Sequence, residues 1–311
     1  MSNTILVTDK LFIFDDQVRQ LQEAGFSVER LDRSQATEEE LCEAIKGKVG
    51  YIVGGTERIT PAVIAAADEL RAIALTNDMW QETIPAYPQA TERGILISNA
   101  PGANAYSVAE YTLTLILMML RRPLELGSTG TSKFITTGSS VDARVAIIGM
   151  GKIGELVARM LVGIGATDIV YWNRQAKPEL HEELGIRFMP LDELVSTADV
   201  ITTHVPSTAG EVLDKDLLKT TKPGVVLVNT GSEATYNNDA LYDLLIDQKA
   251  RAAFDFPIDE NRFEKLTADT WFYSNAWAGY NTHEAAQIAS DMAALSLINL
   301  LTTGQDDFRV N

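Results

Sequence analysis

Residues 144–154 read Arg-Val-Ala-Ile-Ile-Gly-Met-Gly-Lys-Ile-Gly, an apolar strand followed at once by a glycine-rich turn. In this pattern Gly149 permits a tight turn, and Gly151 lets the backbone approach a pyrophosphate. Gly154 lets the helix that follows pack closely on its strand. The stretch therefore predicts the phosphate-binding turn of a dinucleotide-binding βαβ unit.

The residues that follow supply the context that this turn requires. Lys152 and Ile153 stand at the N-terminus of the predicted helix, whose backbone amides would face the phosphates. A second apolar strand, residues 168–172, ends about where the ribose of a cofactor would lie. This context favours cofactor binding over a glycine-rich turn that only packs against its neighbours.

The residues after the second strand bear on the choice of cofactor. NAD-binding proteins usually place an acidic side chain there, which accepts a hydrogen bond from the ribose 2′-hydroxyl. This chain instead has Asn173, Arg174 and then Lys177, which would attract a 2′-phosphate. NADP is therefore the predicted cofactor. NAD is the alternative if Arg174 only stacks on the adenine.

Length and composition set the broad class. The 311 residues suit two domains of about 150 residues each, and the 46% that are hydrophobic can form a core in both. The net charge of −17 disfavours nucleic acid and anionic membranes as partners. The longest apolar run, residues 111–120, is too short to span a bilayer.

The single cysteine and the three histidines bear on the cellular location of the protein and on metal binding. Cys42 stands alone, so no internal disulfide can form, and no charged and then apolar leader opens the chain. These features predict a cytoplasmic protein. The histidines and the cysteine show no metal-ligand spacing, so no metal site is predicted.

The N-terminal third alternates between strand and helix signals. The predicted strands are 5–7, 26–31, 50–53, 72–75 and 94–98. The predicted helices are 17–24, 38–45, 61–70 and 85–93. Such alternation implies a parallel sheet covered on both faces, so this region is predicted to be doubly wound, without a phosphate-binding glycine turn of its own.

A strongly apolar helix is predicted next. Ser107 to Glu110 matches a capping box, and the helix is expected to run to Arg122 and to stop at Pro123. Because it is apolar on nearly every face, it is expected to bridge two domains or to lie in a dimer interface. Residues 127–140 are rich in Gly, Ser and Thr and predict a surface loop.

Beyond the second strand of the βαβ unit the alternation continues. The predicted strands are 200–203, 225–229 and 252–254. The predicted helices are 191–196, 238–248 and 284–301. The last of these helices could return to the first domain.

Several motifs together resemble the D-isomer-specific 2-hydroxyacid dehydrogenase family. They are the glycine turn and the segments 99–110 (Asn-Ala-Pro-Gly-Ala-Asn-Ala-Tyr-Ser-Val-Ala-Glu), 203–208 (Thr-His-Val-Pro-Ser-Thr) and 222–230 (Lys-Pro-Gly-Val-Val-Leu-Val-Asn-Thr). The resemblance covers nearly the whole chain. It implies an α/β fold of two doubly wound parallel-sheet domains, with a Rossmann cofactor domain inserted into a flavodoxin-like substrate-type domain.

The resemblance also implies how the chain is divided and assembled. Residues 1–102 plus 285–311 would form the substrate-type domain, and residues 103–284 the dinucleotide-binding domain. A small-molecule substrate would bind in the cleft between them. The expected assembly is a homodimer built largely through the cofactor domains.

Further cofactor contacts are implied by the resemblance. Pro206 and Thr208 would lie beside the adenosine half, and Thr230, Gly231 and Asp255 near the nicotinamide. For Asp255 the alternative is a carboxylate that only caps the end of a strand.

Members of this family reduce a 2-oxo acid with an arginine, a histidine and a carboxylate, and this chain departs from that set. Where the arginine is expected, residues 231–233 read Gly-Ser-Glu, which puts Ser232 in its place. Where the histidine is expected stands Ala276. The carboxylate survives as Glu260, unless that residue is a solvated surface glutamate. His204 is interpreted as a residue that shapes the cofactor pocket, not as the catalytic base.

A loop in the first domain has changed as well. Family members fold a glycine-containing loop there, whose amides bind the substrate carboxylate, whereas residues 76–83 read Thr-Asn-Asp-Met-Trp-Gln-Glu-Thr. Asp78 and Glu82 would oppose an anion. A small 2-oxo acid is therefore not the expected substrate. The alternative is that these loops drifted in a protein that is no longer catalytic.

These residues predict an NADPH-preferring reductase that acts on a carbonyl or imine lacking the 2-oxo acid arrangement. Tyr280 is the best replacement acid by position and His283 by pKa, while Glu260 could tune either of them. For both replacement acids a packing or helix-start role is the alternative. The other functions considered are a non-catalytic dinucleotide-binding sensor or scaffold dimer, and a conventional 2-hydroxyacid dehydrogenase.

Overall fold

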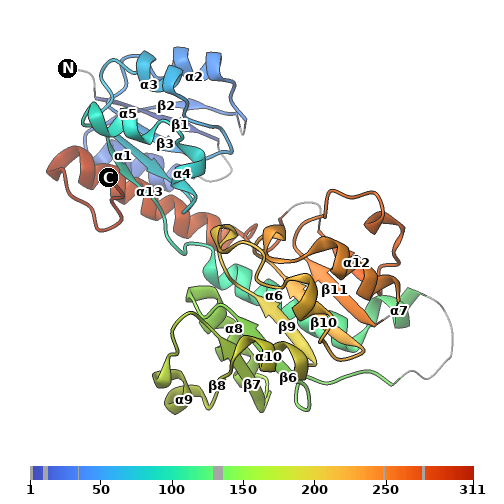
Figure 1. The fold of residues 1–311 in the computed structure, drawn as a ribbon. Coiled ribbons are helices and arrows are strands. Elements are labelled where there is room, and N and C mark those ends of the chain that lie inside the picture. The colour runs from blue at the N-terminus through green and yellow to red at the C-terminus, as the bar shows by residue number, and fades with distance from the viewer. Residues whose placement is uncertain (1–2, 10–12, 34, 129–135, 248, 275–276) are drawn as a thin grey trace. The chain divides into compact units, whose positions relative to one another are not determined.

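The structure is a computed structural model that describes residues 3–9, 13–33, 35–128, 136–247, 249–274 and 277–311. The chain forms two compact units. The first unit comprises Met1–Asn104 and Thr282–Asn311, and the second comprises Ala105–Asn281. Each unit is built around one parallel β-sheet (Figure 1).

In the first unit the described strands form a five-stranded sheet in the order β2-β1-β3-β4-β5, with every neighbouring pair parallel. The strands are β1 (Thr4–Thr8), β2 (Ser27–Leu31), β3 (Gly50–Val53), β4 (Ala72–Leu75) and β5 (Leu96–Ser98). The helices are α1 (Asp15–Glu23), α2 (Glu38–Ala44), α3 (Pro61–Ala66), α4 (Trp80–Thr83), α5 (Tyr87–Glu92) and α13 (His283–Thr303). Helices α1 and α13 cover one face of the sheet, and α2, α3 and α5 cover the other (Figure 1).

In the second unit the described strands form a seven-stranded parallel sheet in the order β12-β11-β10-β9-β6-β7-β8. The strands are β6 (Arg144–Ile148), β7 (Asp168–Trp172), β8 (Arg187–Phe188), β9 (Val200–Thr203), β10 (Val225–Asn229), β11 (Ala250–Phe254) and β12 (Trp271–Tyr273). The α-helices are α6 (Ala105–Arg121), α7 (Pro123–Ser128), α8 (Lys152–Gly163), α9 (Pro178–Leu184), α10 (Leu191–Thr197), α11 (Lys215–Leu218) and α12 (Asn238–Ile246). The 3-10 turns are η1 (Ser207–Ala209), η2 (Glu233–Thr235) and η3 (Phe263–Lys265).

Both faces of this second sheet are buried because its strands carry apolar residues on both sides. In β6, Val145 and Ile147 pack with α6 and α8, whereas Ala146 and Ile148 pack with α10 and α12. The first sheet is covered in the same way. The predicted architecture of two doubly wound parallel-sheet domains is therefore confirmed.

Several predicted boundaries differ from the structure. The helix predicted over 61–70 ends at Ala66, because Ala67 adopts an extended conformation and the chain then turns into β4. The short elements α4, α9, α11, β8 and β12 were not predicted. They are two to seven residues long, too short for a periodic pattern to stand out.

The predicted capping box at Ser107 is wrong. Helix α6 begins at Ala105, so Ser107 lies inside the first turn. Its hydroxyl donates to the carbonyl oxygen of Gly279 at 2.7 Å and so ties α6 to a distant loop of the second unit. A tertiary hydrogen bond has replaced the local one that the sequence pattern suggested.

The segment after α6 also differs from the prediction. Pro123 ends α6 at Arg121 but opens a further helix, α7, as a proline in the first turn can. Residues 127 and 128, predicted as part of a loop, belong to that helix. Residues 129–135 of the predicted loop lie outside the described part of the chain.

Among the described residues, one helix is long and apolar enough by length and composition to cross a membrane. It is α13, and it packs against β3 and β4 of the first sheet. Ala293, Ala294 and Leu297 of this helix lie in the core of the first unit. Its apolar composition therefore matches its place as a core helix.

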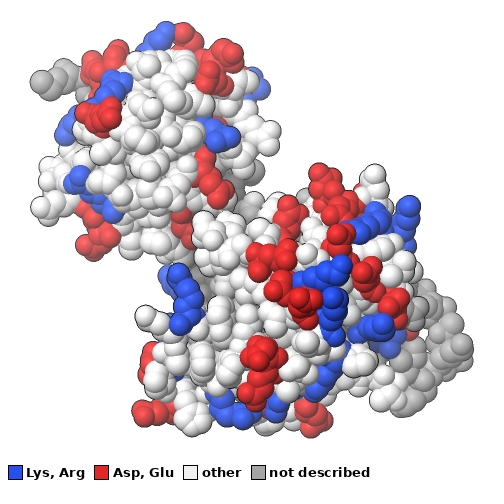
Figure 2. Space-filling model, viewed as in Figure 1, with Lys and Arg blue, Asp and Glu red and all other residues white. Residues whose placement is uncertain are grey.

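Charged side chains are mixed on the visible surface. On the face drawn in Figure 2, Asp and Glu are spread over both units, with Lys and Arg interspersed among them. On that face, the 43 acidic and 26 basic residues of the chain are thus not separated into one acidic and one basic patch.

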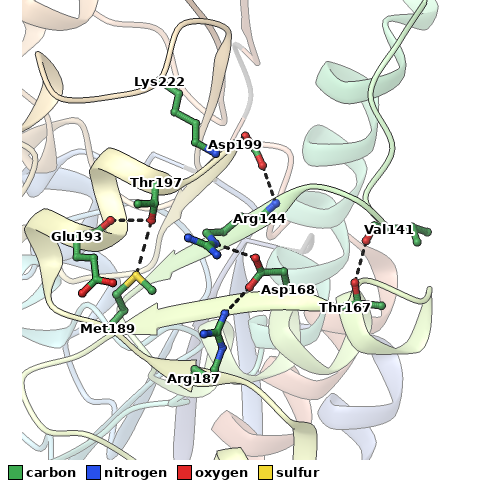
Figure 3. Close-up of polar contacts among 10 residues, drawn as sticks. All are labelled: Val141, Arg144, Thr167, Asp168, Arg187, Met189, Glu193, Thr197, Asp199 and Lys222. Atoms are coloured by element: carbon green, nitrogen blue, oxygen red, sulfur yellow. Dashed lines mark hydrogen bonds and ion pairs between the residues drawn. The ribbon is translucent and has the colours of Figure 1, made fainter.

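An ion-pair network joins the starts of several strands in the second unit (Figure 3). Asp168, at the start of β7, pairs with Arg144 at 2.8 Å and with Arg187 at 2.7 Å. Asp199 accepts from the backbone amide of Arg144 and pairs with Lys222 at 2.9 Å. Burial raises the pKa of Asp168, but hydrogen bonds from the two guanidinium groups bring it below its ordinary value.

Replacing Asp168 by Asn is expected to lower the free energy of unfolding by about 1 kcal/mol at neutral pH, a modest value because the carboxylate is 32% exposed. A lowered folded-state pKa means that this stabilisation is present above the unfolded pKa and is lost as pH falls through the folded pKa. Urea unfolding of both proteins at neutral and acidic pH measures the difference. Asp142→Asn, an exposed carboxylate outside the network, is the control. If the difference in free energy of unfolding between the two proteins were the same at acidic pH, the charge of Asp168 would not be its cause.

Candidate cofactor and catalytic site

The turn between β6 and α8 has the geometry that its glycines predict. Gly149 has a φ of +95°, and a Cβ there would lie 2.5 Å from the carbonyl oxygen of His204. A Cβ on Gly154 would lie 2.2 Å from the carbonyl oxygen of Gly149. Both positions therefore exclude any side chain. The turn is held between the end of β9 and the first turn of α8.

Gly151 is different, because a Cβ there would meet nothing within 4 Å. It is the N-cap of α8, and it contributes no side-chain cap to the helix amides. Lys152 is exposed and Ile153 packs partly into the core, so the amides of this first turn border open space. A backbone surface at a helix N-terminus without a side chain in front of it fits a pyrophosphate.

The residues predicted to read the ribose lie at the end of β7. The side-chain oxygen of Asn173 accepts from the backbone amide of Met150 at 3.4 Å, and its amide nitrogen donates to the carbonyl of Gln175 at 3.0 Å. Arg174 is exposed. Lys177 forms an ion pair with Glu155 of α8, so its charge is already partly compensated. Arg174 is therefore the cation at this edge that remains most available to a phosphate.

His204 follows β9 and is partly buried. Its Nε2 lies 3.0 Å from the Thr202 hydroxyl, and burial lowers its pKa to about 4. The ring is therefore uncharged near neutral pH, as suits a residue that shapes a pocket. Pro206, the N-cap of the turn η1, and Thr208 within that turn are exposed, and the turn begins three residues after His204.

The loop after β10 is organised by the Asn229 side chain. It accepts from the amide of Gly231 and donates to the carbonyl of Ser232, both at 2.9 Å. The hydroxyls of Thr230 and Thr112 lie 2.9 Å apart, which links the loop to α6. Ser232, the residue predicted to replace the family's arginine, caps the turn η2 by accepting from the amide of Ala234. A short hydroxyl engaged in this way cannot grip a carboxylate as a guanidinium does.

Asp255 is the centre of a group that we call the Asp255 cluster, which consists of Tyr111, Asp255, Ser274, Gly279 and Tyr280. Asp255 is 2% exposed and accepts from the Ser274 hydroxyl at 2.7 Å and from the Gly279 amide at 2.8 Å. Burial raises the pKa of Asp255, and these hydrogen bonds offset the rise only in part. Burial and the nearby Asp255 carboxylate raise the pKa of both tyrosines. Both phenols therefore stay protonated at neutral pH and can donate hydrogen bonds.

Tyr111 and Ser274 were not predicted as site residues. Tyr111 appeared in the sequence only as the first residue of an apolar run, and Ser274 did not stand out at all. No local pattern pairs them with Asp255. The glycine of the Ala278-Gly279 pair does have a physical reason, since a Cβ on Gly279 would lie 2.8 Å from the Asp255 carboxylate.

Glu260 and His283 lie in different units. Glu260 forms an ion pair with Arg262 at 2.5 Å, and Arg262 also pairs with Asp239 at 2.7 Å. His283 is the first residue of α13 in the first unit, where its ring meets Phe14 edge-on at 5.4 Å. Glu260 is thus a partly exposed member of a salt bridge, and His283 is exposed at a helix start.

Ala276, the residue predicted to replace the family's histidine, lies outside the described residues. Next to it, Trp277 is 45% exposed, has a φ of +48° and stacks on Phe256 with ring centres 5.2 Å apart. Trp271 is 3% exposed and packs between Phe254 and Phe263 in the core, so it is not a pocket residue.

The changed loop of the first unit forms the helix α4. The side-chain oxygen of Asn77 accepts from the amide of Met79 at 2.9 Å and opens the turn. Asp78 and Glu82 are exposed on this segment. Trp80 packs edge-on against Tyr87 with ring centres 5.0 Å apart. The segment thus presents carboxylates to solvent where the family's loop presents amides.

Comparisons with known proteins agree with this geometry. The family model described as "D-isomer specific 2-hydroxyacid dehydrogenase, NAD binding domain" matches residues 117–278. Glyoxylate reductase of Thermococcus onnurineus is 30% identical over 265 residues, which cover 79% of this chain and 76% of the relative. D-3-phosphoglycerate dehydrogenase of Mycobacterium bovis is 30% identical over 222 residues, which cover 69% of this chain. The chain spans only 42% of the length of that relative.

The solved structures support the fold. NAD+-bound 3-phosphoglycerate dehydrogenase of Entamoeba histolytica aligns with a TM-score of 0.82 at 21% identity, over 100% of this chain and 99% of that one. The structural alignment shows only the fold. The match to the family model and the 30% identity to the glyoxylate reductase show the family as well. Together they show that the chain belongs to the D-isomer specific 2-hydroxyacid dehydrogenase family of oxidoreductases.

Proposed function

We propose that this protein is a reductase that uses NADPH in preference to NADH and acts on a carbonyl or imine lacking the 2-oxo acid arrangement. The observation that carries the proposal is an open turn at Gly151 in the same unit as Ser232, which caps η2 and which we infer replaces the family's arginine. The first feature supports retained cofactor binding. The second removes the group that grips a 2-oxo acid.

The residues that would hold the cofactor follow the chain from β6 to β11. Gly151 and the first turn of α8 would take the pyrophosphate, Arg174 the 2′-phosphate, and Thr230 with Asp255 the nicotinamide end. When bound, the nicotinamide supplies a hydride. The protein must then bind the hydride acceptor, orient it and stabilise or protonate the charge that develops on it.

For a carbonyl acceptor, a proton must reach the oxygen as the hydride arrives. We assign this task to the Tyr280 hydroxyl, which belongs to the Asp255 cluster and is 37% exposed. Because the phenol stays protonated, it can donate to a developing alkoxide. Glu260 and His283 stay proposed tuning groups, although the ion pair of Glu260 with Arg262 makes it the weaker of the two.

NADPH is expected to bind at least about tenfold more tightly than NADH, because Arg174 is exposed where a 2′-phosphate would lie. Asn173→Asp should reverse this preference by adding an acceptor for the 2′-hydroxyl and repelling the phosphate. Titration of the intrinsic tryptophan fluorescence with each cofactor measures both affinities. Lys177→Met is the matched control and should change them less than Arg174→Ala, since Lys177 already pairs with Glu155. Equal or tighter binding of NADH to the unaltered protein would contradict the proposal.

A non-catalytic sensor or scaffold dimer is the second candidate. The observation that favours it is that Ser232 is engaged in capping η2 and that Glu260 is engaged by Arg262. The two candidates differ in turnover. Tight NADPH binding without oxidation of NADPH by a panel of aldehydes, ketones and imines would favour the sensor.

The proposed setting is a reducing compartment, with a homodimer as the assembly. Leu124 and Leu126 on α7 are each 42% exposed, and Val141 is 44% exposed. Apolar side chains of this kind support an interface in the second unit. Sedimentation of the purified protein measures the assembly directly.

A further inference from the structure

The Asp255 cluster holds a buried negative charge that no cation of the described chain compensates. The carboxylate is bound by a hydroxyl and a backbone amide, and no Lys, Arg or His of the described residues pairs with it. In the family pattern, an arginine and a histidine would supply positive charge on this side of the nicotinamide. Ser232 and Ala276 supply none. A buried carboxylate without a cationic partner is unfavourable, so a ligand that brings a positive charge gains from it.

The neighbouring groups favour a cation as well. Glu233 is exposed beside Ser232 in the loop after β10. Arg262, which pairs with Glu260, also pairs with Asp239, so its charge is shared by two carboxylates. Tyr280 of the cluster is 37% exposed, and Trp277, three residues earlier in the chain, is 45% exposed. Aromatic rings together with a carboxylate are the usual surroundings of an organic cation in proteins.

This inference rests on the proposed function and names its substrate class. We propose that the substrate is a protonated imine, a cation that brings its own proton to the site. The site then carries one positive charge near Asp255 both before and after the reaction. Before it the charge is on the iminium group, and after it the charge is on the oxidised nicotinamide.

The chemistry explains why a general acid can be dispensed with. The iminium carbon takes a hydride from the dihydronicotinamide and forms a C–H bond, while the π electrons of C=N become the lone pair of nitrogen. The reductant loses two electrons as that hydride and becomes a pyridinium. The product is a neutral amine, which takes a proton from water after release. A ketone would instead become an alkoxide beside Asp255. An alkoxide needs a proton donor, and such a donor contributes about 10²- to 10⁴-fold to the rate.

The first test compares two substrates of the same size with NADPH: 1-pyrroline, a cyclic imine that accepts a proton, and cyclopentanone, its neutral ketone counterpart. NADPH oxidation is expected to be about 10²-fold or more faster with 1-pyrroline. Tyr280→Phe should lower the cyclopentanone rate at least about tenfold more than the 1-pyrroline rate, because only the ketone requires a proton at that step.

The second test measures binding without turnover. Pyrrolidine, which is a cation at neutral pH, is titrated by calorimetry into the protein loaded with NADPH and into the protein loaded with NADP+. It is expected to bind about tenfold or more tightly to the NADPH form, because a pyridinium already compensates Asp255 in the other. Cyclopentanol, the neutral counterpart, should show no such preference.

Variants connect this preference to the carboxylates. Asp255→Asn should abolish the difference between the two forms. Asp247→Asn, which changes an exposed carboxylate at the C-terminal end of α12, should leave the difference intact. If Asp255→Asn does not fold, Glu233→Gln serves in its place and should weaken pyrrolidine binding about threefold.

The outcomes separate this inference from the proposed function. Cyclopentanone turnover equal to or faster than that of 1-pyrroline, or equal binding of pyrrolidine to both forms, overturns the cationic substrate and leaves an NADPH-dependent reductase. Failure of NADPH to bind overturns the proposed function itself.

Discussion

Pyruvate, glyoxylate and hydroxypyruvate are expected to be reduced at least about 10⁴-fold more slowly than the 1 to 10³ per second typical of enzymes. A missing general acid alone accounts for about 10²- to 10⁴-fold. The loss of the guanidinium adds to it, since Ser232 is fixed as the cap of η2 and cannot bind a carboxylate in two places. In the first unit, the exposed Asp78 adds repulsion of any anion near α4.

The measurement is the loss of NADPH or NADH absorbance with each acid at saturating cofactor. The double variant Ser232→Arg with Ala276→His is the informative comparison, because it restores both family residues. Its rate on at least one of the three acids is expected to rise about 10²-fold or more above that of the unaltered protein. Turnover of the unaltered protein within the ordinary enzymatic range would show that the site has been misread.

The second large effect is expected at the glycine turn between β6 and α8. Replacing Gly154 by alanine should destabilise the fold, whereas replacing Gly151 should weaken only cofactor binding. In Gly154→Ala the new methyl group would lie 2.2 Å from the Gly149 carbonyl oxygen, which is backbone and cannot move aside cheaply. We expect a loss of about 2 to 4 kcal/mol in the free energy of unfolding, together with loss of cofactor binding. In Gly151→Ala the methyl group enters open space, so the fold should persist.

For Gly151→Ala the expected result is therefore a stable protein whose NADPH affinity falls about 10²-fold or more, because the methyl group occupies the space that fits a pyrophosphate. Gly163→Ala is the matched control in the same helix. A Cβ there meets nothing within 4 Å, and alanine should stabilise the helix by about 0.5 to 1 kcal/mol. Thermal unfolding and fluorescence titration measure both quantities. Unchanged NADPH affinity in Gly151→Ala would place the pyrophosphate elsewhere.

Most of the secondary structure could be predicted where the local pattern is strong. Strands Val200–Thr203 and Val225–Asn229, which begin with consecutive apolar residues, occur as predicted. The start of α6 could not be predicted, because a sequence motif at Ser107 competed with a hydrogen bond to Gly279 that exists only in the folded chain. Short elements such as β12 depend on pairing with a neighbouring strand and leave no periodic signal.

The sequence alone determined the glycine turn and the doubly wound architecture, and it predicts that the family's arginine and histidine are replaced. Each depends on residue type at fixed local spacing: Gly149 must adopt a positive φ, Gly154 must approach backbone, and a serine cannot act as a guanidinium. Only the tertiary structure decided the surroundings of Asp255. It brought Tyr111 of α6 and Ser274 beyond β12 to one carboxylate, and it gave Lys177 a partner in Glu155. Contacts between residues far apart in the chain are set by how helices and strands pack, and packing of that kind leaves no pattern in the local sequence.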